Sequence, residues 1–333
     1  MRRAVPLLLC VLLAIVSDVP AAPLDTAAVR GFIADMNLKH GFDAAALTRT
    51  FANVSRIDRI IELIAKPAEK VKPWYEYRAL FITDKRIREG AAFWRANEAV
   101  VLRASETYGV APEVIVAIIG VETSYGANVG SYRVIDALST LAFHYPDNNK
   151  TRSAFFRTQL EQFLLMARDD HLDPMVLTGS YAGAMGMPQF MPDSYRRLAV
   201  DFDGDGARNI WNDADDAIGS VANYLHEHGW RRAGPVTTMA RVSGANPATF
   251  LKTTIKPDFR LADFTAAGIM PVRSGNPDDE TALFELEGTR GNEYWIGYTN
   301  FYVISRYNPR VKYAMAVAQL SEEIRKLHGG PGS

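Results

Sequence analysis

Residues 114–121 read Val-Ile-Val-Ala-Ile-Ile-Gly-Val, a stretch with no polar side chain. Pro112 stands just before it, where the first turn of a helix tolerates proline. A helix that is apolar on every side must be surrounded by other elements, so these residues predict a buried central helix. The chain has 333 residues, 48% of them hydrophobic, and can build a core of the necessary size. We expect this helix to end at Glu122, with Gly126 as its C-terminal stop.

Glu122 directly follows the apolar run. A carboxylate at the end of such a helix is unusual, because an unpaired buried charge is costly. Loss of water and the negative end of the helix dipole should both raise its pKa. A carboxyl group that keeps its proton near neutral pH can protonate a glycosidic oxygen. The alternative is that Glu122 caps a neighbouring helix or pairs with an arginine.

The rest of the chain predicts a mostly α fold (α+β). Helical periodicity marks residues 98–108, 135–143, 153–168 and 217–227, and a closing helix at 313–327 follows the segment 300–307. Between residues 236 and 286 the sequence is richer in Thr, Pro and short alternating runs, such as 282–286. This change predicts a small mixed or β-containing subdomain inserted into a helical body.

The N-terminus has the pattern of a secretory signal peptide. Two arginines precede an apolar run at residues 7–16, and small residues follow near Ala21. We therefore expect residues 1–21 to be removed, and residues 22–333 to form the mature periplasmic protein. Cys10 is the only cysteine, and Leu9 before it argues against lipid attachment. The net charge of −1 gives no field that favours nucleic acid, and nothing requires more than a monomer.

Residues 179–192 form a run dense in Gly and Ala with Met, Phe and Tyr around them. Small residues let a backbone approach a ligand closely. Ser180 and Gln189 could hydrogen-bond to a polar substrate, while Tyr181 or Phe190 stacks on a sugar ring. The alternative is a tightly packed turn between helices.

Asp201, Asp203 and Asp205, followed by Gly206, match the start of an EF-hand calcium loop. Ala207 would add its carbonyl oxygen. The closing Glu of a standard loop is absent, because Asn212 stands at that position. Three nearby residues could close a longer loop: Asp213, Asp215 and Asp216. We expect a structural Ca²⁺ here, and the alternative is a solvated acidic turn.

Taken together, these motifs resemble lytic murein transglycosylases of the B type. Residues 122–126, 179–192, the loop from 201 and residues 216–224 occur in that family's order, and 72–78 and 135–141 add support. The similarity extends from residue 32 to 320. It implies a lysozyme-like catalytic core at about 100–235 with an EF-hand-like loop at 201–216. It also implies a helical N-terminal extension, a smaller lobe at about 236–290 and a closing helical segment at 300–328.

The resemblance also assigns roles. Glu122 corresponds to the catalytic glutamate that cleaves the β-1,4 bond between N-acetylmuramic acid and N-acetylglucosamine and leaves a 1,6-anhydro end. Residues matching the sugar-binding groove are Ser180, Gln189 and Tyr224, with Asn300, Tyr302 and Tyr307 in a groove-facing segment. Calcium would be held by Asp201, Asp203, Asp205, Asp216 and the Ala207 carbonyl. No organic cofactor is implied.

The substrate would be peptidoglycan glycan strands, and cell-wall synthases are candidate protein partners. The chain departs from the family pattern after Tyr145-Pro146, where residues 147–151 are inserted before Arg152. Two other functions stay open at this point: a hydrolytic muramidase on the same scaffold, and a peptidoglycan-binding protein without activity.

Overall fold

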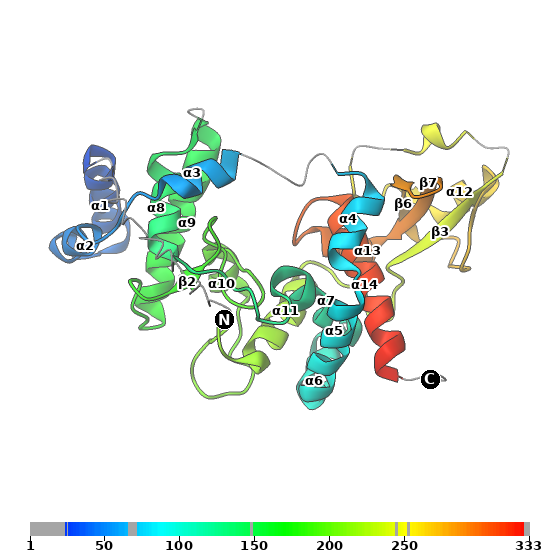
Figure 1. The fold of residues 1–333 in the computed structure, drawn as a ribbon, viewed down its shortest axis with the longest axis horizontal. Coiled ribbons are helices and arrows are strands. Elements are labelled where there is room, and N and C mark those ends of the chain that lie inside the picture. The colour runs from blue at the N-terminus through cyan, green and yellow to red at the C-terminus, as the bar shows by residue number, and fades with distance from the viewer. Residues whose placement is uncertain are drawn as a thin grey trace, which may run out of the picture.

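The computed structural model describes residues 24, 26–65, 72–146, 149–243, 246–251 and 254–329. The expected signal peptide and Cys10 lie outside these residues. The fold is mostly helical with one small antiparallel sheet, as the sequence predicts. Figure 1 shows α1, α2, α8 and α9 at one end of the molecule, the larger sheet at the other, and α5, α6, α7 and α11 between them.

The apolar run forms α7 (Pro112–Thr123), in which every residue from 114 to 121 is buried. It packs against α5 (Asp84–Ala96), α6 (Glu98–Tyr108), α11 (Ala214–Glu227) and α14 (Val311–Gly329). The predicted buried central helix is therefore confirmed. Its end differs from the prediction, because α7 stops at Thr123 and Ser124 is already left-handed, with φ of 50°.

A second group of helices lies on the N-terminal side of the core. The predicted helices at 135–143 and 153–168 are found as α8 (Val134–Phe143) and α9 (Lys150–Asp169). The other members of the group are α1 (Thr26–His40), α2 (Ala44–Phe51), α3 (Asp58–Ala65) and α10 (Pro192–Leu198). Phe32 of α1 meets Phe143 of α8 edge to face, with ring centroids 6.0 Å apart, so the N-terminal helices share the main core.

The inserted lobe is a five-stranded antiparallel sheet in the order β4-β6-β7-β3-β5. Its strands are β3 (Thr237–Val242), β4 (Phe259–Arg260), β5 (Ile269–Pro271), β6 (Glu280–Gly288) and β7 (Gly291–Tyr298). One face joins the main core through Phe284, while the other packs on Phe264 of α12 (Leu261–Ala266) in a small separate core. The alternating run 282–286 lies in β6, and the sheet continues past the predicted boundary at 290.

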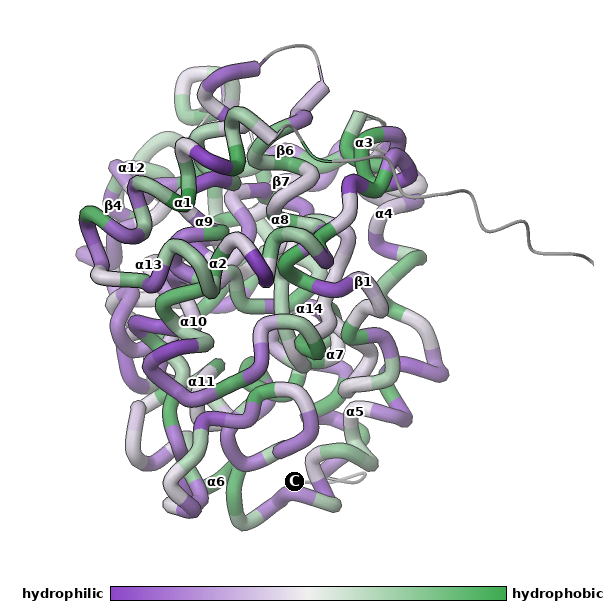
Figure 2. The backbone as a smooth tube through the Cα atoms, turned by 90° about the vertical axis from the view of Figure 1, so that its left-hand side faces the viewer, coloured by the Kyte–Doolittle hydropathy of each residue, from purple (hydrophilic) through white to green (hydrophobic). Residues whose placement is uncertain are grey.

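The chain returns from the sheet through α13 (Thr299–Ser305) into α14, the predicted closing helix. The remaining elements are α4 (Trp74–Phe81), the short 3-10 helix Pro247–Thr249, and a two-stranded sheet of β1 (Tyr132–Arg133) and β2 (Thr178–Gly179). The helix α11 mixes hydrophobic and hydrophilic residues (Figure 2), and residues 216–222, Tyr224 and Leu225 are all buried.

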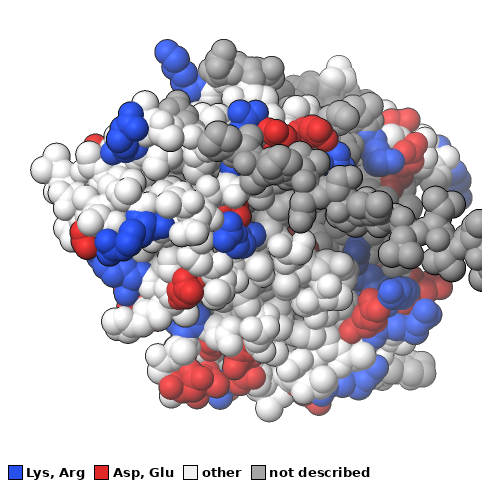
Figure 3. All heavy atoms as spheres, turned by 60° about the vertical axis from the view of Figure 1, so that its left-hand side comes forward, with Lys and Arg blue, Asp and Glu red and all other residues white. Residues whose placement is uncertain are grey.

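No single helix among the described residues is both long and apolar enough to cross a membrane. The pair α6 and α7 passes that test together, but the two helices are bent by 113° at their junction. On the face shown in Figure 3, Lys and Arg side chains and Asp and Glu side chains form small separate groups.

Candidate active site

Glu122 lies on the last turn of α7, with its side chain half-buried. The hydroxyl of Tyr313, from the first turn of α14, donates a hydrogen bond of 2.5 Å to Glu122 Oε1. Burial, and next the charge of Glu122, raise the pKa of Tyr313 well above its ordinary value of 10.0. The hydroxyl therefore keeps its proton, and Glu122 faces a permanent donor.

The backbone after Glu122 has three successive left-handed residues. Ser124, Tyr125 and Gly126 have φ values of 50°, 61° and 89°. Only glycine adopts this region without a penalty, so Ser124 and Tyr125 must be held there by their surroundings. This strained turn begins two residues after Glu122 and sets where its helix ends.

Two side chains hold the turn. Thr123 Oγ1 donates to the Met187 carbonyl oxygen at 3.0 Å and accepts from the Gly126 N–H at 3.0 Å. Tyr125 Oη donates to the Arg86 carbonyl oxygen of α5 at 2.8 Å. The Tyr125 ring occupies the space beside Gly120, where an added Cβ would lie 2.5 Å from its Oη. The end of α7 is thus tied to α5 and to the glycine-rich run.

The glycine-rich run forms a compact wall next to this turn. Ser180 Oγ accepts from the Ala184 N–H at 3.1 Å, which closes the bend around Gly183. Gln189 is left-handed, with φ of 51°, and its Nε2 donates to the carbonyl oxygens of Val129 at 3.1 Å and Gly186 at 3.0 Å. Because Val129 belongs to the loop after α7, Gln189 joins the wall directly to that loop.

Three tyrosines gather around Glu122. The rings of Tyr224 and Tyr307 lie 4.5 Å apart, and Phe190 contacts both. Burial raises the pKa of Tyr224 to about 12 and that of Tyr307 well above 10.0, and the charge of Glu122 adds to both shifts. The sequence predicted both tyrosines as groove residues. The structure places Tyr224 and Tyr307 close enough to Glu122 for its charge to raise their pKa values.

The hydroxyls of these two tyrosines donate hydrogen bonds to backbone carbonyl oxygens of the protein itself. Tyr224 Oη donates to the Arg306 carbonyl oxygen at 2.7 Å, and Tyr307 Oη donates to the Pro188 carbonyl oxygen at 2.9 Å. These bonds fix α13 and the following turn against α11 and the glycine-rich wall. Neither hydroxyl is therefore a free donor, and Tyr224 is only 7% exposed.

Asn300 and Tyr302 lie on α13, in different surroundings. Asn300 is 1% exposed, and its Nδ2 donates to the carbonyl oxygens of Arg231 and Gly234 at 2.9 and 2.8 Å while its Oδ1 accepts from the Arg231 N–H. Both amide hydrogens are thus donated inside the protein, which gives Asn300 a structural role. Tyr302 is half-buried, and the Arg306 guanidinium lies 5.9 Å from its ring centroid.

The acidic loop gathers three carboxylates. Ligand oxygens of Asp201, Asp203 and Asp205 lie within 4.8 Å of one another. Asp201 accepts from the N–H groups of Gly204 and Gly206, both of which are left-handed, at 2.7 and 2.9 Å. The Asp205 N–H acts to lower the pKa of Asp203, but loss of water and the carboxylates of Asp205 and Asp213 outweigh it and raise that pKa. A cation would relieve this repulsion.

Asp216 lies outside that group of three carboxylates, and its part in the calcium site expected from the sequence stays a prediction. It is 1% exposed, and its two carboxylate oxygens accept from the N–H groups of Phe202 and Asn209 at 2.7 and 2.6 Å. It therefore clamps the two ends of the loop. Ala207 is exposed, and its N–H donates to Asp205 Oδ1 at 2.8 Å.

Sequence reasoning missed Tyr313. It was expected only as the first residue of the closing helix, and no motif marks it. It is 191 residues away from Glu122 in the chain, so only the packing of α14 on α7 reveals the contact. The sequence offered only one signal, a tyrosine among apolar residues of a helix expected to pack on the core. Such tyrosines are common in any fold and do not by themselves indicate a site.

A model of the transglycosylase SLT domain family matches residues 25–322. Membrane-bound lytic murein transglycosylase B of Escherichia coli is 44% identical over 302 residues, which cover 88% of this chain and 81% of that protein. The structure of soluble lytic transglycosylase SltB1 from Pseudomonas aeruginosa has 47% identity and a TM-score of 0.85, with 91% of this chain and 100% of that one covered. Lytic transglycosylase Slt35 of Escherichia coli, solved in complex with calcium, has 42% identity and a TM-score of 0.81, with 91% and 94% covered.

Proposed function

The chain belongs to the transglycosylase SLT domain family, whose members cleave peptidoglycan, and we propose that Glu122 carries out this cleavage. The chain is thus a lytic murein transglycosylase, as its B-type relative is. The observation that carries the assignment to Glu122 is the Tyr313 hydrogen bond, which holds one carboxyl group at the meeting point of α7, α14 and the glycine-rich wall.

The proposed reaction needs one carboxyl group. Glu122 donates its proton to the glycosidic oxygen as the β-1,4 bond between N-acetylmuramic acid and N-acetylglucosamine breaks. The N-acetyl carbonyl of the substrate shields the cation that develops at C1. The Glu122 carboxylate then takes the proton of the C6 hydroxyl, whose oxygen bonds to C1 and closes the 1,6-anhydro ring. The nucleophile belongs to the substrate, whereas a hydrolase usually needs a second carboxylate.

The sugar chain is proposed to lie along the wall formed by Ser180 and Gln189 and the ring cluster of Tyr224 and Tyr307. These residues are linked to the loop after Glu122 by the bonds of Gln189 to Val129 and of Tyr307 to Pro188. Tyr302 is a further contact on α13. Homologous SltB3 from Pseudomonas aeruginosa, 30% identical, was solved in complex with NAG-NAM-pentapeptide, which supports a peptidoglycan strand as the ligand.

The acidic loop is proposed to bind a structural Ca²⁺ through Asp201, Asp203 and Asp205, with the Ala207 carbonyl as a further ligand. Three close carboxylates with two left-handed glycines fit the oxygen preference and tight loop geometry of calcium. The relative solved with calcium supports the same ion. The metal would order the loop that leads into α11 and takes no part in the chemistry.

We place the protein in the periplasm, in loose association with the cell envelope, on the strength of the N-terminal sequence pattern and the membrane-bound relative. No nucleic-acid partner is proposed, and the protein is proposed to act as a monomer.

Digestion of purified sacculi tests the function. The wild-type enzyme should release muropeptides with 1,6-anhydro ends, which are one water lighter than hydrolysis products, and Glu122→Gln should release almost none while keeping its fold. Glu106→Gln, the same change at an exposed position of α6, is the matched control and should stay fully active. Reducing ends from the wild type would indicate a muramidase, and absence of any release would indicate a binding protein.

A further inference from the structure

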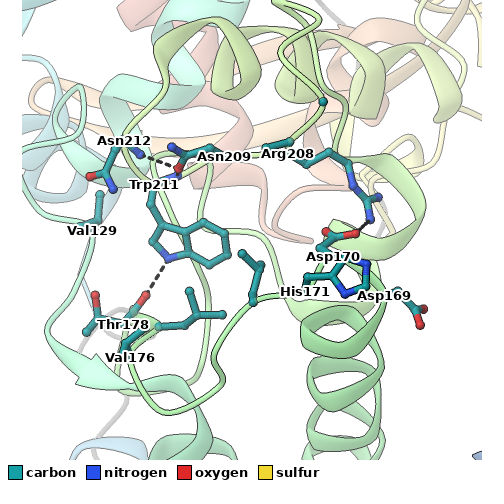
Figure 4. Close-up of a pocket in the computed structure, with 14 residues that line it drawn as sticks. Val129, Asp169, Asp170, His171, Val176, Thr178, Arg208, Asn209, Trp211 and Asn212 are labelled. Carbon is teal, nitrogen blue, oxygen red and sulfur yellow. Dashed lines mark hydrogen bonds and ion pairs between the residues drawn. The ribbon is translucent and has the colours of Figure 1, made fainter.

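A second cavity, of about 590 Å³, lies between the C-terminal end of α9, strand β2 and the loop 206–212 (Figure 4). Of its lining residues, Val129 also belongs to the loop that Gln189 contacts, and the others lie outside the Glu122 site described above. Its size falls in the range of small-molecule sites, about 300–1,000 Å³, and is enough for one or two sugar rings. The proposed reaction does not use this space, although Gly206 and Ala207 of the acidic loop form part of its wall.

The indole of Trp211 projects into the middle of this cavity, between Thr178 on one side and His171 on the other (Figure 4). Its Nε1 donates to the Thr178 carbonyl oxygen at 2.9 Å, and its ring packs on Tyr195 with centroids 5.7 Å apart. These two contacts fix the ring plane. Trp211 is nonetheless only half-buried, so the cavity has a rigid aromatic surface that is open to a ligand.

The charged groups of the cavity are already compensated. Arg208 Nη2 and Asp170 Oδ1 lie 2.5 Å apart, and Asp170 also accepts from Tyr195 Oη at 2.7 Å. Asp169 is bonded to Arg168 and Arg196. The pKa of Asp169 falls below its usual value because these arginines outweigh the opposing effect of burial. Arg208 is thus already paired and is not free to bind the carboxylates of a stem peptide.

Apart from Asp169, Asp170 and Arg208, the described residues of the lining include no Asp, Glu, Lys or Arg side chain. Its apolar side chains include Val129, Leu172, Val176 and Leu177, and Asn212 is exposed. This lining suits a neutral sugar ring with hydroxyl and amide groups. The fixed indole ring offers a stacking surface, the uncharged Thr and Asn side chains offer hydrogen bonds, and the charges of Asp170 and Arg208 are paired. An acidic peptide or a purely apolar ligand would leave these polar groups unmatched.

We propose that this cavity is an accessory site for an N-acetylhexosamine unit of a glycan strand, stacked on Trp211 away from the bond that Glu122 cleaves. The inference rests on the proposed function. The two sites share one segment, because Val129 lines the cavity while its carbonyl oxygen accepts from Gln189. The accessory site would hold long strands and contribute nothing to short ones.

Two variants and a matched control test the site kinetically. Trp211→Phe removes the indole. Val176→Arg fills the mouth of the cavity from a residue that is 65% exposed, so the larger side chain should leave folding intact. Trp295→Phe changes another half-buried tryptophan, in the sheet lobe. On sacculi, the first two variants should raise KM about three- to tenfold, the effect of losing one aromatic contact. Their kcat, and every value for Trp295→Phe, should stay as in the wild type.

A soluble disaccharide-peptide dimer with a single cleavable bond serves as the short substrate, and all variants should cleave it as the wild type does. An unchanged KM on sacculi in both cavity variants would overturn the proposal, and so would an equal loss on the short substrate. Binding is measured separately on Glu122→Gln protein with a β-1,4-linked tetramer of N-acetylglucosamine, read by the NMR signal of the Trp211 indole N–H. A shift of that signal supports the site even if the wild type proves inactive on sacculi, whereas no shift refutes it.

Discussion

Gly120 lies two residues before Glu122 on α7, and a single added carbon there should disturb how the end of this helix is held. Replacing a helical glycine by alanine usually stabilises a helix by about 1 kcal/mol. At Gly120, however, the new Cβ would lie 2.5, 2.6 and 2.7 Å from Oη, Cζ and Cε1 of Tyr125. Contacts this short force the ring to move.

The magnitude follows from three contributions. Overpacking of a filled core costs about 1–3 kcal/mol. Displacement of the Tyr125 ring also breaks its hydrogen bond to the Arg86 carbonyl oxygen, a loss of about 1 kcal/mol that offsets the gain in helix propensity. Gly120→Ala should therefore lower the free energy of unfolding by about 1–3 kcal/mol. Because Tyr125 belongs to the turn after Glu122, kcat should fall about tenfold or more.

The assay is urea denaturation together with kcat on sacculi, with Gly31→Ala as the matched control. Gly31 lies inside α1, is exposed, and has nothing within 4 Å of its added Cβ. The same substitution there should raise the free energy of unfolding by about 0.5–1 kcal/mol and leave kcat unchanged. If Gly120→Ala proved as stable as Gly31→Ala with full activity, the proposed role of Tyr125 would be refuted.

Three further predictions concern other parts of the site. Tyr313→Phe removes the donor to Glu122, so kcat on sacculi should fall about tenfold with little change in KM; an unchanged kcat would show that the hydrogen bond does not position the carboxyl group. Chelation of calcium should lower the Tm of the wild type, and Asp203→Asn should abolish this dependence; equal Tm values with calcium and chelator would argue against a structural ion. Burial lowers the pKa of His228 below its ordinary 6.5, so its contribution to stability is complete above pH 6.5 and is lost as pH falls toward the lower folded value. An NMR titration of His228 that gave a pKa above 6.5 would contradict this.

The sequence predicts the fold well where burial decides it. The run 114–121 has no polar face, so a buried helix is the only element that accommodates it, and α7 is found there. The helix was predicted to end at Glu122 with Gly126 as its stop, but it ends one residue later, at Thr123, and Ser124 is its left-handed cap. Tyr125 fills the space beside Gly120 and bonds to Arg86 of α5, and this long-range packing imposes the left-handed turn already at Ser124.

The site residues divide in a similar way: those in a local motif were predicted, and those defined by long-range contacts were not. Glu122, Ser180 and Gln189 were predicted because each lies in a local motif, and the structure ties Gln189 to the loop after Glu122 through the Val129 carbonyl oxygen. Tyr313 carries no local signal, since its partner is distant in the chain. The capping of the loop ends by the Asp216 carboxylate was not predicted, because it depends on backbone N–H directions that a sequence does not show.

The most direct test of the mechanism is mass analysis of the muropeptides that wild-type and Glu122→Gln proteins release from the same sacculi. A single carboxyl group that returns the proton of the C6 hydroxyl predicts anhydro ends from the wild type and almost none from the variant. Anhydro products from Glu122→Gln at near wild-type rates would contradict it, because another group would then be handling the proton.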